Sequence, residues 1–178
     1  MIRKFLSETA LNLHKEHLKK LKLQYSVFEK SKPEIIGKDI SEISRLRIKD
    51  KAEIIKLSCD IRCHELFFSS FGTAYESCVA VRKKYRAEAS FLYELYECGR
   101  SIDYSFIIIY LDKEEVRIIS GTPEIVLKIP NPMLAIDLYE HSYFLDYGFD
   151  KEEYLKNLIP FLNLSKLDKF LQTRIEKR

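Results

Sequence analysis

The sequence predicts an α+β fold, in which an N-terminal antiparallel helical hairpin is followed by a small three-stranded antiparallel sheet flanked by helices. Two observations support this prediction. Apolar residues recur at helical spacing through the first half of the chain, and β-branched runs separated by turn residues begin only after Gly99. We expect two domains, residues 1–72 for the hairpin and residues 73–178 for the sheet and its helices.

The first half reads as two long helices joined by a connection rich in helix breakers. Ser7 is a good N-cap for the first helix, which carries the apolar series Leu11, His14, Leu18, Leu21 and Tyr25. Pro33 and Gly37 then interrupt the pattern. A second helical series begins near Ile48, continues through His64 and Phe68, and ends at Gly72. Two long helices with such a connection favour an antiparallel hairpin.

The second half alternates helical and β-type patterns. The expected elements are a helix over 75–96, strands over 104–111 and 116–120, a β-branched run over 125–129 closed by Pro130 and Pro132, a strand over 133–137 that leads into a helix at Glu140, and a helical tail over 151–177 with a break at 160–163.

Composition narrows the function classes. The 178 residues include 46% hydrophobic and 32% charged residues, as in ordinary globular proteins. The formal charge of +3 is too small for a dedicated nucleic-acid binder. The longest apolar run, Phe106–Leu111, is far shorter than the roughly 20 residues of a membrane-spanning helix. We therefore expect no membrane association.

The four cysteines are interpreted as reduced thiols, because a chain of this length does not depend on disulfides. Cys59, Cys63 and His64 raise the alternative of a zinc site, although their spacing is not the usual C-x-x-C. The basic, amphipathic start could be a mitochondrial presequence, but its acidic residues Glu8 and Glu16 favour a segment of the fold. We expect a mitochondrial or cytoplasmic protein that is not secreted.

Three of the four histidines, His14, His64 and His141, lie on or beside apolar stripes. One such histidine is more often a hydrogen-bonded core residue than a metal ligand. Asp137 precedes His141 by one helical turn, so both side chains can point toward one place. Three histidines and this aspartate together favour a metal site.

The segment 136–147, I-D-L-Y-E-H-S-Y-F-L-D-Y, resembles the iron/manganese superoxide dismutase signature D-x-W-E-H-A-Y-Y-L-x-Y. Residues 150–164 resemble that family's segment P-D-Y-x-K-x-F-W-x-V-x-N-W with its tryptophans replaced. His64–Phe68 resembles H-x-L-F-W, and Leu11–His14 resembles the start of L-x-x-H-H-x-x-H-H. The resemblance extends from about Phe5 to Leu171.

The resemblance implies a mononuclear site for one iron or manganese ion, lying between the two domains. Its ligands would be His14, His64, Asp137 and His141. Iron and manganese both accept such nitrogen and oxygen ligands. Glu140 would reach across a two-fold interface to the ligand histidine of a partner, with Tyr143 at the same interface. The implied partner is a second copy or a related chain.

Around this ligand set the sequence departs from the family pattern. Leu18 and Lys22 replace a gateway histidine and a tyrosine that guards the substrate funnel, and Tyr139 replaces a tryptophan. The family supplies its active-site glutamine from one of two places in the sequence, and it is absent from both here. Asp60 occupies one of these places, and Glu124 lies near the other. His17 is about 100° around the helix from the gateway position, so we expect a solvated or interface side chain.

Three functions remain open from the sequence. The first is a divergent superoxide dismutase that converts superoxide to dioxygen and hydrogen peroxide. The second is a catalytically degenerate, dismutase-like structural subunit of a larger assembly, such as the small subunit of the mitochondrial ribosome. The third is a protein that binds metal for stability alone. The lost gateway, tyrosine and glutamine favour the second and third, and the retained ligands favour the first and third.

Overall fold

The computed structural model describes residues 2–72 and 78–175. Their order along the chain is η1 (Ile2–Lys4), α1 (Glu8–Ser31), η2 (Pro33–Ile35), α2 (Ile40–Arg45), α3 (Lys51–Ser69), α4 (Val79–Lys84), α5 (Glu88–Arg100), β1 (Phe106–Asp112), β2 (Glu115–Gly121), η3 (Pro123–Leu127), β3 (Pro132–Asp137), η4 (Glu140–Ser142), α6 (Phe144–Tyr147), α7 (Lys151–Leu158), η5 (Ile159–Phe161) and α8 (Ser165–Ile175), where η denotes a 3₁₀ helix. The predicted α+β fold class is confirmed.

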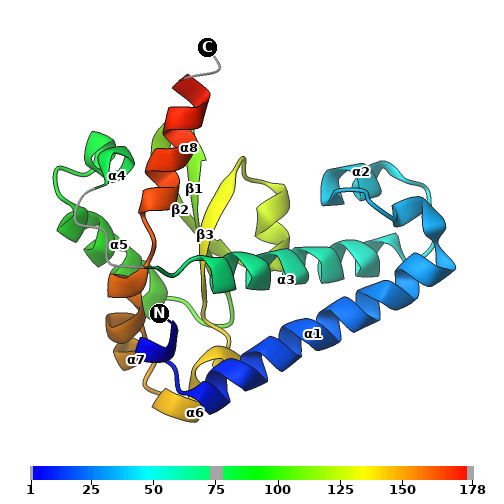
Figure 1. The fold of residues 1–178 in the computed structure, drawn as a ribbon, viewed down its shortest axis with the longest axis horizontal. Helices are drawn as coiled ribbons and strands as arrows, with labels where there is room; N and C mark the ends of the chain where they lie inside the picture. Colours follow the sequence, from blue (N-terminus) through cyan, green and yellow to red (C-terminus); the bar gives the residue numbers. More distant parts are fainter. Residues whose placement is uncertain (1, 73–77, 176–178) are drawn as a thin grey trace.

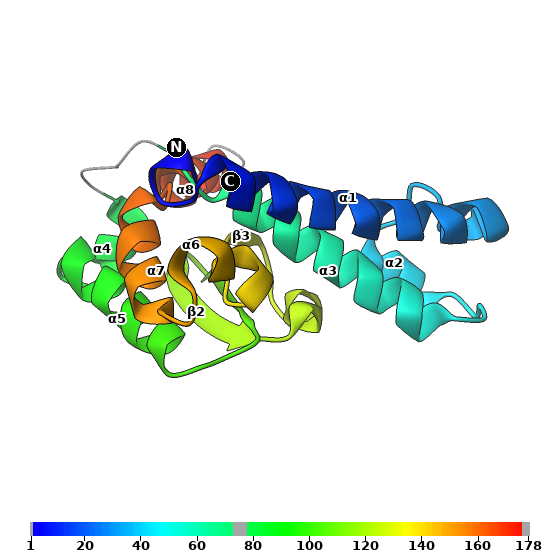
Figure 2. The same ribbon diagram turned by 90° about the horizontal axis from the view of Figure 1, so that it is seen from below.

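The N-terminal hairpin consists of α1 and α3, which lie side by side and run in opposite directions (Figures 1 and 2). Ser7 begins α1 as expected, since its hydroxyl accepts a hydrogen bond from the backbone of Ala10 at 3.1 Å. A small cluster of Ile35, Ile43 and Ile54 joins α2 to α3. This cluster holds the connection of the hairpin against its second helix.

The sheet has the strand order β2-β1-β3, and both pairings are antiparallel. The central strand β1 is fully buried from Phe106 to Ile109. In Figure 1, α3 lies on one side of the sheet and α4, α5 and α7 lie on the other. Phe106 at the start of β1 pairs with Asp137 at the end of β3. The register therefore brings Asp137 to the end of the sheet, where the chain turns into η4.

One hydrophobic core includes Phe5, Phe67 on α3, the central strand and Leu171 on α8. It thus draws on both halves of the sequence. The division into domains at residue 72 stays a prediction.

Three segments differ between the prediction and the structure, two expected elements and one helix that was not expected. The helix predicted over 75–96 is replaced by α4 and α5, because the chain is extended at Tyr85 and Ala87; its first residues lie outside the described part. The run 125–129 belongs largely to η3, whose buried residues Pro123 and Val126 are three apart, as the 3₁₀ period requires. The connection after Gly37 contains α2, which we did not predict; Asp39 caps it in a capping box with Glu42.

Replacing Ser70 by alanine is expected to destabilise the protein by about 1–3 kcal/mol. The buried Ser70 hydroxyl donates to the carbonyl of Leu66 and accepts from the backbone N–H of Ala135, both at 2.7 Å. It therefore ties α3 to the outer edge of β3, and its loss leaves a buried N–H without this acceptor. Urea unfolding measures the change. The control Ser26→Ala, at an exposed hydroxyl on α1, should cost less than about 0.5 kcal/mol, and equal losses would contradict the prediction.

Candidate metal centre

Four side chains from four elements converge where the hairpin meets the sheet. His14 lies on α1, His64 on α3, Asp137 at the end of β3 and His141 in η4. One ligand atom of each lies within 4.8 Å of the others. His14, His64 and Asp137 are at most 1% exposed, whereas the side chain of His141 is 34% exposed. The structure brings together all four residues that the resemblance indicates; their role as ligands stays a prediction.

The separations of the four donor atoms fit one metal ion. Oδ2 of Asp137 lies 3.1 Å from Nε2 of His14, 3.6 Å from Nε2 of His64 and 3.2 Å from Nε2 of His141. The Nε2 atoms of His64 and His141 are 3.2 Å apart. Two ligands bound at about 2.1 Å, with angles of about 95–120° between them, lie about 3.1–3.6 Å apart. The donors are thus spaced for a common ion.

Two of these donors are buried without a hydrogen-bond partner among the described residues, Nε2 of His14 and Oδ2 of Asp137. They are close enough for a hydrogen bond but not aligned for one. A buried polar group left unpaired costs about 1–3 kcal/mol. A bound cation would satisfy both atoms at once, and this is the feature that separates the site from a set of core histidines.

Backbone contacts fix the orientation of Asp137. Its Oδ1 accepts a hydrogen bond from the backbone N–H of Tyr139 at 2.9 Å, so Oδ2 is left to face the histidines. Its carbonyl accepts from the hydroxyls of Ser142 at 3.0 Å and Tyr154 at 3.1 Å. The carboxylate is held in place before any ion binds.

The ring of His64 is held from its other side. Its Nδ1 lies 2.9 Å from the backbone carbonyl of Asp60 and 3.2 Å from Oδ1 of the same residue. Both oxygens are acceptors, so Nδ1 carries the proton and Nε2 is free to bind an ion. His17, Asp60 and His64 form a second close group of metal-binding side chains. Because Nδ1 of His64 is already a donor there, this group is better explained by hydrogen bonding than by a second ion.

The electrostatics of the cluster favour an ionised Asp137 and shift the pKa values of His14 and His64 in opposite directions. Burial raises the pKa of Asp137, but the neighbouring His14 and His141 outweigh it and hold the pKa far below its usual value. Burial lowers the pKa of His14, against the opposing charge of Asp137. For His64, burial lowers the pKa, but Asp60 and Asp137 together raise it above the ordinary value.

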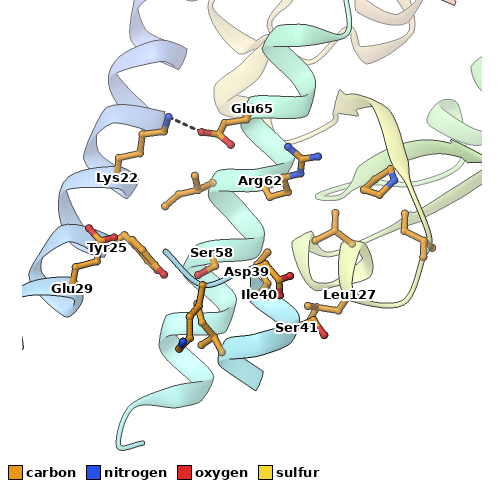
Figure 3. A pocket seen from close by; sticks show the side chains of 16 residues that line it. Lys22, Tyr25, Glu29, Asp39, Ile40, Ser41, Ser58, Arg62, Glu65 and Leu127 are labelled. Carbon is orange, nitrogen blue, oxygen red and sulfur yellow. Dashed lines mark ion pairs between the residues drawn. The ribbon is translucent and has the colours of Figure 1, made fainter. Parts of the chain in front are cut away.

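A cavity of about 860 Å³ opens elsewhere, between α1, α2, α3 and η3 (Figure 3). Its wall includes Tyr25, Ile40, Arg62 and Leu127, and an ion pair of 2.6 Å joins Lys22 to Glu65 at one side. The described residues that line it include none of the four converging side chains. The cavity is separate from the metal centre.

Comparison with known proteins identifies the second half of the chain. The family described as "Iron/manganese superoxide dismutases, C-terminal domain" matches residues 75–170, more than half of the sequence. The chain belongs to the iron/manganese superoxide dismutase family. Asp137 and His141 lie within the matched region, whereas His14 and His64 lie before it.

A curated relative of this dismutase family agrees with that result. "Superoxide dismutase [Mn], mitochondrial" from Capsicum annuum is 34% identical over 102 residues, which is 53% of this chain. The aligned region is 40% of the relative, so the match spans about two fifths of its length.

The other residues that the dismutase resemblance indicated lie around the centre. The ring of Tyr139 stacks on His141 at 5.8 Å between centroids, and Glu124 is half-buried in η3. Glu140 accepts a hydrogen bond from the hydroxyl of Tyr104 at 3.1 Å. Tyr143 is buried against Tyr154, with ring centroids 4.9 Å apart. Their roles in catalysis or at an interface stay predictions.

The structure does not show the solvated side chain expected as one alternative for His17, and its place at an interface stays a prediction. Its half-buried ring lies 4.5 Å from that of His141 and 5.0 Å from that of His64, centroid to centroid. Burial and these two rings lower the pKa of His17 to about 4. His17 follows His14 by three residues, and residues i and i+3 share a helix face, so the sequence could have predicted that the two rings lie near each other. His17 therefore borders the candidate metal centre, although the gateway position itself holds Leu18.

The structure does not bring the cysteines into a zinc site. Neither Cys59 nor Cys63 belongs to a group of metal-binding side chains within residues 2–72 and 78–175. The thiol of Cys63 instead lies 3.6 Å from the carbonyl of Pro123. The described cysteines are free, as expected.

Cys59 and Cys78 are expected to resist alkylation by iodoacetamide at pH 8. Burial, helped by nearby carboxylates, raises the pKa of each thiol to about 12, so the reactive thiolate is about 1,000-fold rarer than for an ordinary cysteine. Mass spectrometry measures the extent of alkylation of each cysteine in the native protein and in protein unfolded by guanidinium. In the native protein the half-exposed Cys98 should react first. Fast native labelling of Cys59 would contradict it.

No helix in the described part of the chain is both long and apolar enough to span a membrane.

Proposed function

We propose that this chain is a superoxide dismutase that holds one iron or manganese ion between His14, His64, Asp137 and His141. The observation that carries the proposal is the pair of buried, unpartnered atoms, Nε2 of His14 and Oδ2 of Asp137, facing the Nε2 atoms of two further histidines. Membership of the dismutase family supports the choice of these two metals.

When bound, such an ion would supply one-electron chemistry, oxidising one superoxide to dioxygen and reducing another, with two protons, to hydrogen peroxide. The four residues would set the net charge around the ion. One ionised carboxylate and three neutral imidazoles leave the charge of a divalent or trivalent ion only partly neutralised, which attracts an anionic substrate. Nδ1–H of His64 donates a hydrogen bond to Asp60, so Nε2 of this ring carries no proton and can bind the ion.

Access to the centre is expected from the side of His141. Its side chain is 34% exposed, whereas those of His14, His64 and Asp137 are buried. The rings of His17 and Tyr139 both lie beside the His141 ring, at 4.5 and 5.8 Å between centroids.

The test is superoxide decay followed by stopped-flow spectrophotometry at pH 7.5. Protein loaded with manganese or with iron should accelerate the decay well beyond the same concentration of free ion. Loading each metal separately tells which one supports turnover. A protein that binds metal but consumes superoxide no faster than free ion would contradict the proposed activity.

We also propose self-association through the region of Glu140 and His141, either with a second copy or with a related chain. The resemblance supports it, and so do the exposed apolar side chains of Phe144, Leu145 and Phe149, which continue from this region. Sedimentation velocity should show a dimer, and Phe149→Glu should shift it toward the monomer. A wild-type monomer at micromolar concentration would contradict pairing with a second copy and leave only the related chain as partner.

A mitochondrial location is the compartment we propose. It is supported by the name of the Capsicum annuum relative, which is a mitochondrial enzyme. Fractionation of cells that express the full chain with a C-terminal tag tests it, and recovery in the cytosol alone would contradict it.

A further inference from the structure

We propose that Asp60 is a positioning residue for the metal centre, acting through His64 and not through the substrate. The inference rests on the proposed metal binding at His14, His64, Asp137 and His141. It assigns to the carboxylate at this position a task that its place in the sequence did not suggest.

The first step is geometric. Asp60 and His64 are separated by one turn of α3, and Oδ1 of Asp60 lies 3.2 Å from Nδ1 of His64. The backbone carbonyl of Asp60 accepts from the same nitrogen at 2.9 Å. The carboxylate therefore faces the far side of the imidazole from Nε2, which points toward Asp137 and His141.

The second step concerns what a carboxylate adds to a hydrogen bond that the carbonyl already makes. A ligating histidine that donates its other N–H to a carboxylate is oriented more firmly and becomes a stronger donor to the metal. The negative charge also stabilises a trivalent ion more than a divalent one. Asp60 should thus raise the affinity for both states and favour the oxidised one.

The third step is that the Asp60 carboxylate is only partly shielded from water. The Asp60 side chain is 27% exposed, while the imidazole it faces is 1% exposed. His17, on the neighbouring helix α1, completes the close group with Asp60 and His64. The carboxylate consequently lies at the boundary of the site, near enough to His64 to act on it and outside the set of converging donor atoms.

Two substitutions separate orientation from charge. Asp60→Ala removes both and should weaken Mn²⁺ binding about 10-fold or more, the lower range of losses seen for such outer contacts. Asp60→Asn keeps an oxygen that can accept from Nδ1, so affinity should stay within about threefold. The amide lacks the charge, so the midpoint potential of the bound ion should rise. A tenfold loss of preference for the trivalent state corresponds to about 59 mV.

The experiment uses the full chain and Mn²⁺ as the probe, with affinity measured by competition against a chelator and the potential by redox titration of the loaded protein. Glu53→Gln, an exposed carboxylate on the same helix, is the matched control and should match wild type in both. Circular dichroism checks that each variant is folded.

The outcomes distinguish this inference from the proposed function. Weaker binding by Asp60→Ala, with a raised potential in Asp60→Asn, supports the positioning role even if the loaded wild type fails to consume superoxide. If the wild type binds Mn²⁺ and both Asp60 variants match its affinity and its midpoint potential, the inference is overturned and the dismutase proposal is left intact. A wild type that binds no Mn²⁺ overturns both.

Discussion

Asp137→Asn is expected to weaken metal binding by at least about 100-fold. Loss of contacts around a ligand costs about 10–100-fold, and this change removes a charged ligand itself. The amide keeps an acceptor for the N–H of Tyr139, so the backbone geometry should survive. Metal analysis after growth with iron and manganese should give about one ion per wild-type chain and almost none for the variant.

Asp112→Asn is the matched control, because Asp112 lies at the opposite end of the sheet, where it pairs with Glu115. It should retain the wild-type metal content. Full occupancy in Asp137→Asn would show that Oδ2 of Asp137 is not a ligand, and the proposed site would be wrong.

Tyr154→Ala is expected to cost about 3–5 kcal/mol of stability, the largest loss we predict. Tyr154 is 0% exposed, stacks on Tyr143 and donates its hydroxyl to the carbonyl of Asp137 at 3.1 Å. Truncation would leave a cavity beneath the turn that carries two of the candidate ligands. Urea unfolding of the metal-free protein measures the loss without a contribution from bound ion.

Two further variants locate the origin of that loss. Tyr154→Phe keeps the ring and should cost only about 1 kcal/mol, for the missing hydrogen bond. Tyr93→Ala, at a tyrosine of α5 that is 66% exposed, should change stability by less than about 0.5 kcal/mol. If Tyr93→Ala and Tyr154→Ala lose the same amount, burial of Tyr154 is not the cause.

The sequence predicted most accurately those features that depend on a short segment of neighbouring residues. Ser7 caps its helix where an N-cap residue was expected, and the side chains of Asp137 and His141 come within 3.2 Å of each other, as their spacing indicated. The strands around Phe106 and Val116 followed directly from their β-branched composition. In these cases a short segment contains the physical reason for its structure.

The features that were missed depend on contacts between distant segments. Ile125 and Val126 belong to a β-branched run, yet the segment packs against α3 as η3, because β3 already occupies the free side of β1. His17 gains its place only when α3 and η4 bring two other histidines beside it. By contrast, α2 carried a readable local signal, the Asp39 and Glu42 capping box.

The dispersal of the four donors along the sequence governs when metal can be captured. His14 belongs to the first long helix, yet it meets Asp137 and His141 only after the sheet has paired and the following turn has formed. During synthesis, an emerging chain that has not yet reached His141 lacks the fourth of the converging donors. Under the proposed metal binding, ion capture would be a late event in folding, and a bound ion would join α1 to η4 through His14 and His141.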